Sequence, residues 1–218
     1  MKDDQIHQSI AILTEAVKAW VSPVVTIVAT QGKDPFKVLV SCILSLRTRD
    51  QTTAEASARL FALADSPEKM VRLDVPQIEA AIYPVGFYRV KAEQILEISR
   101  SLCDLYRGAV PDDLETLLKF KGVGRKTANL VLTLGFGKPG ICVDIHVHRI
   151  CNRWGYVKTR TPEQTEFALR EKLPAEYWII INDLLVTFGQ NQCTPLSPRC
   201  STCPLYDLCD RVSVVKSR

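Results

Sequence analysis

Long apolar runs are missing from this chain of 218 residues. The two longest apolar stretches, residues 24–29 and 130–136, fall well below the roughly 18 residues that a membrane span requires. The opening residues, Met-Lys-Asp-Asp-Gln, include two acids and precede no apolar signal region, so we expect neither secretion nor a membrane partner. Repeats and low-complexity linkers are also missing. With 46% hydrophobic and 24% charged residues, the composition excludes the collagen, coiled-coil and disordered classes.

Strand signals are lacking as well, because no convincing alternating run or hairpin dipeptide is present. Apolar residues recur instead at helical spacing, and two stripes are clear: Ile6, Ile10, Leu13, Val17 and Trp20, then Phe36, Leu39, Val40, Ile43 and Leu44. The sequence therefore predicts an all-α fold of roughly ten helices.

Several local signals place helix ends. Asp50 is the expected N-cap of a helix that runs to Ala64, and Ser66 before Pro67 starts another. Thr161 with Gln164 predicts a capping box. Gly189 is expected to end the helix that carries residues 178–185, and residues 111–120 are expected to form a helix of their own.

The net charge of +4 is too small to require an anionic partner, but its distribution is uneven. Residues 116–143 contain no acid and five bases, namely Lys119, Lys121, Arg125, Lys126 and Lys138. A solvated surface is the simplest interpretation, while a local cationic patch is what phosphate contacts need.

The eight cysteines fall into two groups. Four lie scattered within apolar helical patterns and are expected to be small core residues: Cys42, Cys103, Cys142 and Cys151. The others form the spacing C-x6-C-x2-C-x5-C in a proline-rich tail: Cys193, Cys200, Cys203 and Cys209. Without a secretory signal this spacing favours a metal site over disulfides. Four thiolates can hold a [4Fe–4S] cluster or a zinc ion, and the single C-x2-C pair favours the cluster without excluding zinc.

A glycine turn, Gly122-Val123-Gly124, separates two expected helices within the basic segment. Such a turn permits positive φ and lets backbone amides approach a phosphate. Lys126 follows in the first turn of the second helix. It can be interpreted either as a surface lysine or as a nucleophile. A cation at a helix N-terminus is destabilised, which favours the neutral amine that Schiff-base chemistry needs.

Asp144 is the first acid after the basic segment and is expected to cap a helix that runs through Trp154. His146 and His148 follow closely, but only His148 would share a face with Asp144. We therefore expect the histidines to be structural rather than metal ligands.

Four segments in order resemble the endonuclease III family of helix–hairpin–helix DNA glycosylases. They are the wedge-like loop of residues 86–92, the glycine turn with Lys126, the segment of residues 143–146 around Asp144, and the cysteine tail. The resemblance implies Lys126 and Asp144 as catalytic residues, the four tail cysteines as ligands of a [4Fe–4S] cluster, and duplex DNA with damaged bases or abasic sites as the partner. It also implies DNA contacts from Lys121, Gly122, Val123, Gly124, Arg125, Arg47 and Phe87.

The implied fold has two helical lobes with a DNA groove between them. One is a six-helix barrel over residues 21–135 that contains the helix–hairpin–helix motif, and the other joins residues 1–20 to 136–218 and holds the iron–sulfur loop, residues 193–209. The expected activity is that of a bifunctional glycosylase and abasic-site lyase for oxidised pyrimidines, because a related adenine-specific subfamily lacks the lysine. We expect a cytoplasmic, nucleoid-associated monomer from a prokaryote.

Three positions depart from the family pattern. Arg47 stands where this branch commonly has glutamine, Phe87 where an aliphatic wedge is common, and Phe120-Lys121 where Leu-Pro is usual. A uracil or thymine mismatch glycosylase that acts opposite guanine therefore remains an alternative, as does a non-catalytic DNA-binding module with a zinc-stapled tail.

Overall fold

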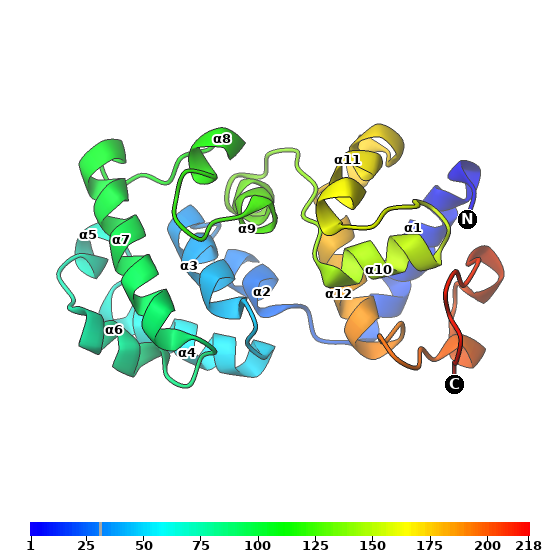
Figure 1. Cartoon of the computed structure of the whole chain (residues 1–218), viewed down its shortest axis with the longest axis horizontal. Helices are drawn as coiled ribbons and strands as arrows, with labels where there is room; N and C mark the ends of the chain where they lie inside the picture. The colour runs from blue at the N-terminus through cyan, green and yellow to red at the C-terminus, as the bar shows by residue number, and fades with distance from the viewer. Residues whose placement is uncertain (31) are drawn as a thin grey trace. The chain divides into compact units, whose positions relative to one another are not determined.

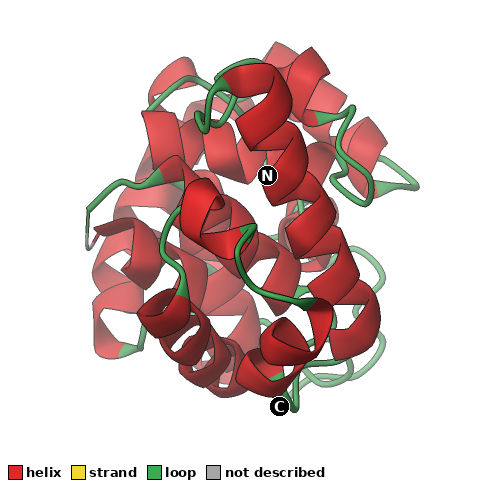
Figure 2. Ribbon diagram, turned by 90° about the vertical axis from the view of Figure 1, so that its left-hand side faces the viewer, coloured by secondary structure: helices red, strands yellow, loops and turns green. Residues whose placement is uncertain are grey.

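The computed structural model describes residues 1–30 and 32–218. Within those ranges it contains helices joined by turns and no strand (Figure 2), so the predicted all-α class is confirmed. The chain forms two compact units, one of residues Val24–Lys138 and one of Met1–Pro23 with Pro139–Arg218. The chain passes from one unit to the other twice, and the second passage, between Lys138 and Pro139, falls inside the glycine- and proline-rich segment 135–140.

The Val24–Lys138 unit is built around α3 (Pro35–Ser45), which packs against four of its other helices. Eight of the eleven residues of α3 are buried, because helices cover it on several sides. Its neighbours are α2 (Val24–Thr30), α4 (Asp50–Leu63), α7 (Tyr88–Tyr106) and α9 (Arg125–Leu130), and the unit is completed by α5 (Pro67–Met70), α6 (Val75–Ile82) and α8 (Leu114–Leu117) (Figure 1). A π-helical turn, Val131–Gly135, continues α9.

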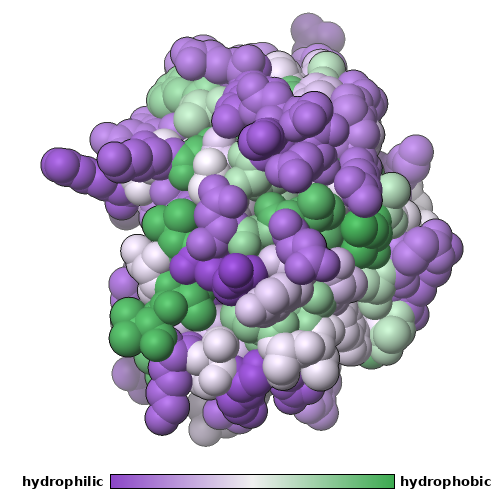
Figure 3. Space-filling view, turned by 90° about the vertical axis from the view of Figure 1, so that its right-hand side faces the viewer, coloured by the Kyte–Doolittle hydropathy of each residue, from purple (hydrophilic) through white to green (hydrophobic). Residues whose placement is uncertain are grey.

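The other unit contains helices from both ends of the chain. These are α1 (Ile6–Ala16), α10 (Ile145–Arg153), α11 (Pro162–Lys172) and α12 (Ile181–Asn191), and α12 contacts both α1 and α10 (Figure 1). Their core includes the fully buried side chains of Leu13, Trp154 and Phe188. In the view of Figure 3, apolar patches interrupt a largely hydrophilic face.

The predicted helix end at Gly189 is wrong. Gly189 is buried inside α12, which continues to Asn191. A Cβ at this position would lie 2.4 Å from His146 Nδ1 and 2.9 Å from Arg149 Nη2, both on α10. The glycine therefore permits the close approach of two helices instead of ending one.

The local helix signals are otherwise partly right. Ser66 and Thr161 cap their helices as predicted, and each accepts a hydrogen bond from the backbone three residues later. Asp50, however, is the first residue of α4, and Arg49 holds the N-cap position. The Gln164 side chain accepts from the N–H of Arg160 (2.9 Å), one residue before the cap that the capping box predicts.

The helix expected over residues 111–120 is much shorter. Asp113 caps it, with Oδ1 accepting from the N–H of Thr116 (2.8 Å), and α8 ends at Leu117. The residues after α8 form tighter 3₁₀-type turns, because the N–H groups of Lys119 and Phe120 donate to the carbonyls of Thr116 and Leu117, three residues back. The same tightening ends α1 at Ala16, before the Trp20 that its apolar stripe predicts.

No single described helix is long and apolar enough to cross a membrane. One bent pair, Asp3–Ala19 with Val24–Thr30, passes that test by length and composition only.

Candidate functional site

The glycine turn between α8 and α9 is exposed to solvent and is held in place by Gln94 on α7. Gly122 has a φ of +75°, and a Cβ there would lie 2.5 Å from Gln94 Nε2 on α7. That same nitrogen donates to the carbonyl of Lys121 (2.9 Å). Gly124, the N-cap of α9, is exposed and has no atom within 4 Å of its Cβ position. An anion can therefore approach the backbone here without meeting a side chain.

The basic segment is partly neutralised by acids from outside it. Lys121 Nζ lies 3.6 Å from Glu97 Oε2, and Lys138 Nζ lies 2.5 Å from Asp112 Oδ2. Both pairs are exposed, so a competing phosphate can replace the carboxylate at little cost. Val123, by contrast, is buried and anchors the turn to its unit.

Lys126 occupies the first turn of α9 and is half-buried. Burial raises the pKa of the Cys42 thiol on α3 to about 12, and the charge of Lys126 partly opposes that rise. The Cys42 thiol therefore stays protonated at neutral pH.

Asp144 caps α10 as predicted and is 9% exposed. Its Oδ1 accepts from the N–H groups of His146 (2.8 Å) and Val147 (2.9 Å). The cap holds the carboxylate in one orientation through a single oxygen. Asp144 belongs to the unit with both chain ends, whereas Lys126 belongs to the Val24–Lys138 unit.

Each of the two neighbouring histidines takes part in a polar contact within the same unit. His148 Nδ1 lies 2.7 Å from Thr165 Oγ1, and His146 Nδ1 lies 3.1 Å from Arg149 Nη2. Burial lowers the pKa of His148. The His148 contact joins α10 to α11, whereas the His146 contact lies within α10.

Arg47 and Phe87, far apart in sequence, are brought together. Both are exposed, both have left-handed backbones (φ +53° and +60°), and the Arg47 guanidinium carbon lies 5.5 Å from the Phe87 ring centroid. We call these two residues the stacking pair. A guanidinium over an aromatic ring forms a flat, polarisable surface of the kind on which a base can stack.

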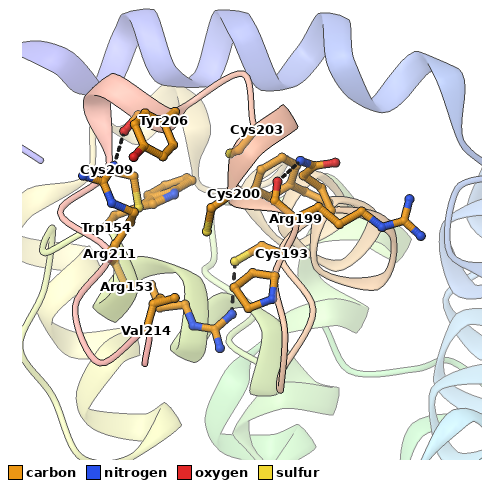
Figure 4. Close-up of a pocket in the computed structure, with 13 residues that line it drawn as sticks. Arg153, Trp154, Cys193, Arg199, Cys200, Cys203, Tyr206, Cys209, Arg211 and Val214 are labelled. Atoms are coloured by element: carbon orange, nitrogen blue, oxygen red, sulfur yellow. Dashed lines mark hydrogen bonds between the residues drawn. The ribbon is translucent and has the colours of Figure 1, made fainter. Parts of the chain in front are cut away.

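The four tail cysteines line one pocket, and their sulfur atoms surround it (Figure 4). A [4Fe–4S] cluster needs thiolates spread around a cavity, because each cysteine binds a different iron atom. Burial raises the pKa of the Cys203 thiol to about 11 and also raises that of Cys209. Binding of the cluster must therefore displace their protons. The donor set and its arrangement fit the group.

Arg153, which sequence reasoning missed, belongs to this pocket. Its Nη1 donates to Cys193 Sγ (3.3 Å) and to the carbonyl of Thr194 (2.7 Å), and its Nη2 donates to the carbonyl of Pro195 (2.5 Å). A cation on a ligand sulfur stabilises its thiolate form. The only signal in the sequence was its place in the last turn of the helix capped by Asp144.

The remaining cysteines are packing residues, as expected. Cys42, Cys142 and Cys151 are buried, Cys103 is half-buried, and none of the four is in a disulfide. Burial raises the pKa of Cys151 to about 12.

Comparison with known proteins gives consistent matches over most of the chain. Residues 40–175 match the HhH-GPD superfamily of base excision DNA repair proteins, and residues 193–209 match the iron–sulfur binding domain of endonuclease III. Endonuclease III from Thermotoga maritima is 51% identical over 177 residues, which cover 81% of this chain and 83% of the relative.

Two solved structures resemble nearly the whole chain. A non-covalent endonuclease III–DNA complex matches with a TM-score of 0.85 and 31% identity, covering 97% of this chain and 96% of the other. A trapped endonuclease III–DNA covalent intermediate matches with a TM-score of 0.81 and 32% identity, covering 97% of each chain.

These matches favour a [4Fe–4S] cluster over a zinc ion in the cysteine tail. They also favour an enzyme over a non-catalytic DNA-binding module. The protein is a bifunctional DNA glycosylase and abasic-site lyase of base excision repair, it acts on DNA, and it carries a [4Fe–4S] cluster. The chain belongs to the endonuclease III family of the HhH-GPD superfamily.

Proposed function

We propose that the protein removes oxidised pyrimidines from duplex DNA and cleaves the strand at the resulting abasic site through Lys126. The observation that carries the proposal is the position of this lysine, the second residue of α9 and two positions after Gly124 of the open glycine turn. A phosphate held on the backbone amides of that turn would bring a neighbouring sugar within reach of the amine.

The contacts to DNA would come from two parts of the Val24–Lys138 unit. Phosphates would lie on Lys121, Gly122, Gly124 and Arg125 of the turn that the buried Val123 anchors, and these contacts position the duplex without reading its sequence. The stacking pair would occupy the space that the flipped nucleotide leaves. Flipping costs a few kcal/mol and is easiest for a damaged or mispaired base, which supports selection of lesions.

In the proposed reaction the neutral amine of Lys126 attacks C1′ of the flipped nucleotide, and the base leaves with the bonding electron pair. Asp144 helps to activate the amine and stabilises the positive charge that develops on the sugar. The C1′–O4′ bond of the sugar ring then breaks, O4′ takes up the proton that the attacking amine has lost, and Lys126 is joined to C1′ as a protonated Schiff base. Loss of a proton from C2′ and departure of the 3′-phosphate break the strand.

The cluster ligands are proposed to be Cys193, Cys200, Cys203 and Cys209, one thiolate for each iron. The cluster supplies structural support or redox sensing, since base removal and β-elimination need no electron transfer. Arg153 would keep positive charge beside the Cys193 sulfur throughout.

We assign residues 21–135 to the lobe with the glycine turn and Lys126, and residues 1–20 with 136–218 to the lobe with Asp144 and the cluster. A single lysine nucleophile and a single cluster fit a protein that acts as a monomer. An enzyme of chromosomal DNA works where the chromosome lies, which supports a cytoplasmic, nucleoid-associated location in a prokaryote.

Incision of a panel of duplexes tests this proposal. The substrates carry thymine glycol, 5-hydroxycytosine, uracil opposite guanine, thymine opposite guanine, or an abasic site. We expect incision of the two oxidised pyrimidines and of the abasic site. Preferred incision of uracil or thymine opposite guanine would replace the proposed substrate class with the mismatch class, which Arg47 keeps open.

A further inference from the structure

Lys91 is a buried lysine on α7 that the proposed reaction does not use. Its residue is 5% exposed, and its ammonium donates three hydrogen bonds, to the carbonyls of Leu44 (2.9 Å) and Leu46 (2.6 Å) and to Thr48 Oγ1 (3.2 Å). All three acceptors are uncharged groups at or just after the end of α3. Burying an ammonium group costs free energy unless its N–H groups are hydrogen-bonded. The burial of Lys91 therefore calls for a structural reason.

The first part of that reason is the end of α3. The last carbonyls of a helix lack backbone donors, and a cation there also meets the negative end of the helix dipole. Lys91 takes the place of the missing donors for Leu44 and Leu46. It thereby fixes the chain immediately before Arg47, whose φ is +53°.

The second part is the turn that precedes α7. The N–H of Gly86 donates to Thr48 Oγ1 (3.2 Å), the same oxygen that accepts from the Lys91 ammonium. A Cβ on Gly86 would lie 2.7 Å from the Arg47 carbonyl oxygen, so the two turns meet backbone to backbone. The N–H of Lys91 also donates to the carbonyl of Phe87 (3.0 Å). One residue therefore bonds both turns, through its side chain and through its backbone.

Both members of the stacking pair have left-handed backbones without being glycine. A left-handed backbone is unfavourable for a residue with a Cβ and persists only where its surroundings hold it. The bonds through Lys91, Thr48 and Gly86 are surroundings of that kind. Burial lowers the pKa of Lys91 to about 8, so the three-donor ammonium is the main form at neutral pH.

We propose that Lys91 is a positioning residue that holds the Arg47 turn and the Phe87 turn together, so that the stacking pair enters the vacated base stack already assembled. The inference rests on the proposed function, which gives Arg47 and Phe87 that place in the DNA. A preassembled pair loses little further freedom on entering the duplex, which favours the flipped state.

Two kinds of variant test the proposal. Lys91→Met removes the ammonium, and Thr48→Val removes only the oxygen shared by the two turns, a milder change should Lys91→Met fail to fold. Thr48→Ser keeps the hydroxyl and serves as the matched control. Lys69→Met removes an exposed ammonium that pairs with Asp65 on the same unit, and it controls for charge.

Three measurements separate positioning from general stability. The first is hydrogen exchange of the Gly86 amide in the free holoprotein. The second is the fluorescence of 2-aminopurine placed opposite an abasic site, followed as the duplex is bound. The third is borohydride trapping on a single-stranded abasic oligonucleotide, which requires the Lys126 chemistry but no filling of a stack.

Thr48→Val removes the acceptor of the Gly86 N–H and should speed Gly86 exchange and slow the 2-aminopurine change by roughly tenfold, the effect of losing about one buried hydrogen bond. Lys91→Met removes three hydrogen bonds and should change both by at least as much. Both should trap the single strand normally, and Thr48→Ser and Lys69→Met should match the wild type in every measurement. Unchanged Gly86 exchange, or faster exchange with an unchanged 2-aminopurine signal, would overturn the inference alone. A wild-type protein that traps no abasic strand would overturn the proposed function and the inference with it.

Discussion

Replacement of Gly86 by alanine should separate the two turns that carry the stacking pair. The added Cβ would lie 2.7 Å from the Arg47 carbonyl oxygen, whereas ordinary contact begins at 3.4 Å. One of the two backbones must therefore move by roughly 0.7 Å, because neither can rotate aside as a side chain could. Forcing an extra methyl group into such a contact costs about 1–3 kcal/mol of unfolding free energy.

The expected effects can be measured separately on stability and on base excision. A chain of this size loses about 2–4 °C of Tm per kcal/mol, so the melting temperature should fall by roughly 2–12 °C. A displacement that approaches 1 Å near reacting groups can cost about a hundredfold in rate, so single-turnover excision from a lesion duplex should slow by about ten- to a hundredfold. Trapping on a single-stranded abasic oligonucleotide should keep its wild-type rate.

Gly32→Ala is the matched control, because nothing lies within 4 Å of its Cβ position. It should leave both the melting temperature and the excision rate close to those of the wild type. A Gly86→Ala protein that melts and excises like the wild type would refute the backbone contact. Equal losses in both variants would assign them to alanine in a turn, and not to the position of Gly86.

Three further predictions address the cluster, the DNA backbone and the buried lysine. Cys203→Ser should lose iron and the visible absorbance of the cluster and should loosen residues 193–209, and normal iron content with normal stability would contradict the ligand assignment. Lys121→Ala should weaken binding about equally for all DNA sequences and reduce the slope of log affinity against log salt by up to about 1 unit, and an unchanged slope would place this lysine away from phosphate. Because the folded pKa of Lys91 is about 8 and its ordinary value is 10.5, the folded state binds fewer protons between these values. The free energy of unfolding, measured with urea relative to Lys91→Met, should therefore rise as pH increases from about 8 to 10.5 and stay flat below 8, and a fall across that window would contradict the burial of the ammonium.

Features that depend on a few consecutive residues could be predicted from the sequence. Ser66, Thr161 and Asp144 each cap a helix, because a short polar side chain reaches amides two or three positions ahead regardless of the rest of the fold. The apolar spacing in α3 predicted a helix correctly for the same local reason. The cysteine spacing predicted a metal site because all four thiols come from one short loop.

Features that depend on distant parts of the chain could not be predicted. Gly189 looked like a helix end, yet its role is set by α10, some forty residues earlier. Arg47 and Phe87 were singled out separately, but their contact arises only when the end of α3 meets the start of α7. Lys91 stands at the buried spacing of Ile95 and Ile98 on α7, and that placement of a charge was the one local signal of its burial.

The central claim is that Lys126 is the nucleophile, and borohydride trapping on an abasic duplex tests it most directly. Reduction converts a Schiff base to a stable amine, so the wild-type protein should form a covalent adduct with the DNA. Lys126→Gln should form none and cut no strand while still binding DNA, and Lys119→Gln, an exposed base from the same segment, should trap normally. The α-amine of Met1 is the competing nucleophile, although it is buried and bonded to the Trp154 carbonyl (2.5 Å) and Asp210 Oδ2 (2.7 Å). Full trapping by Lys126→Gln would move the chemistry to that amine or to another lysine and contradict the assignment.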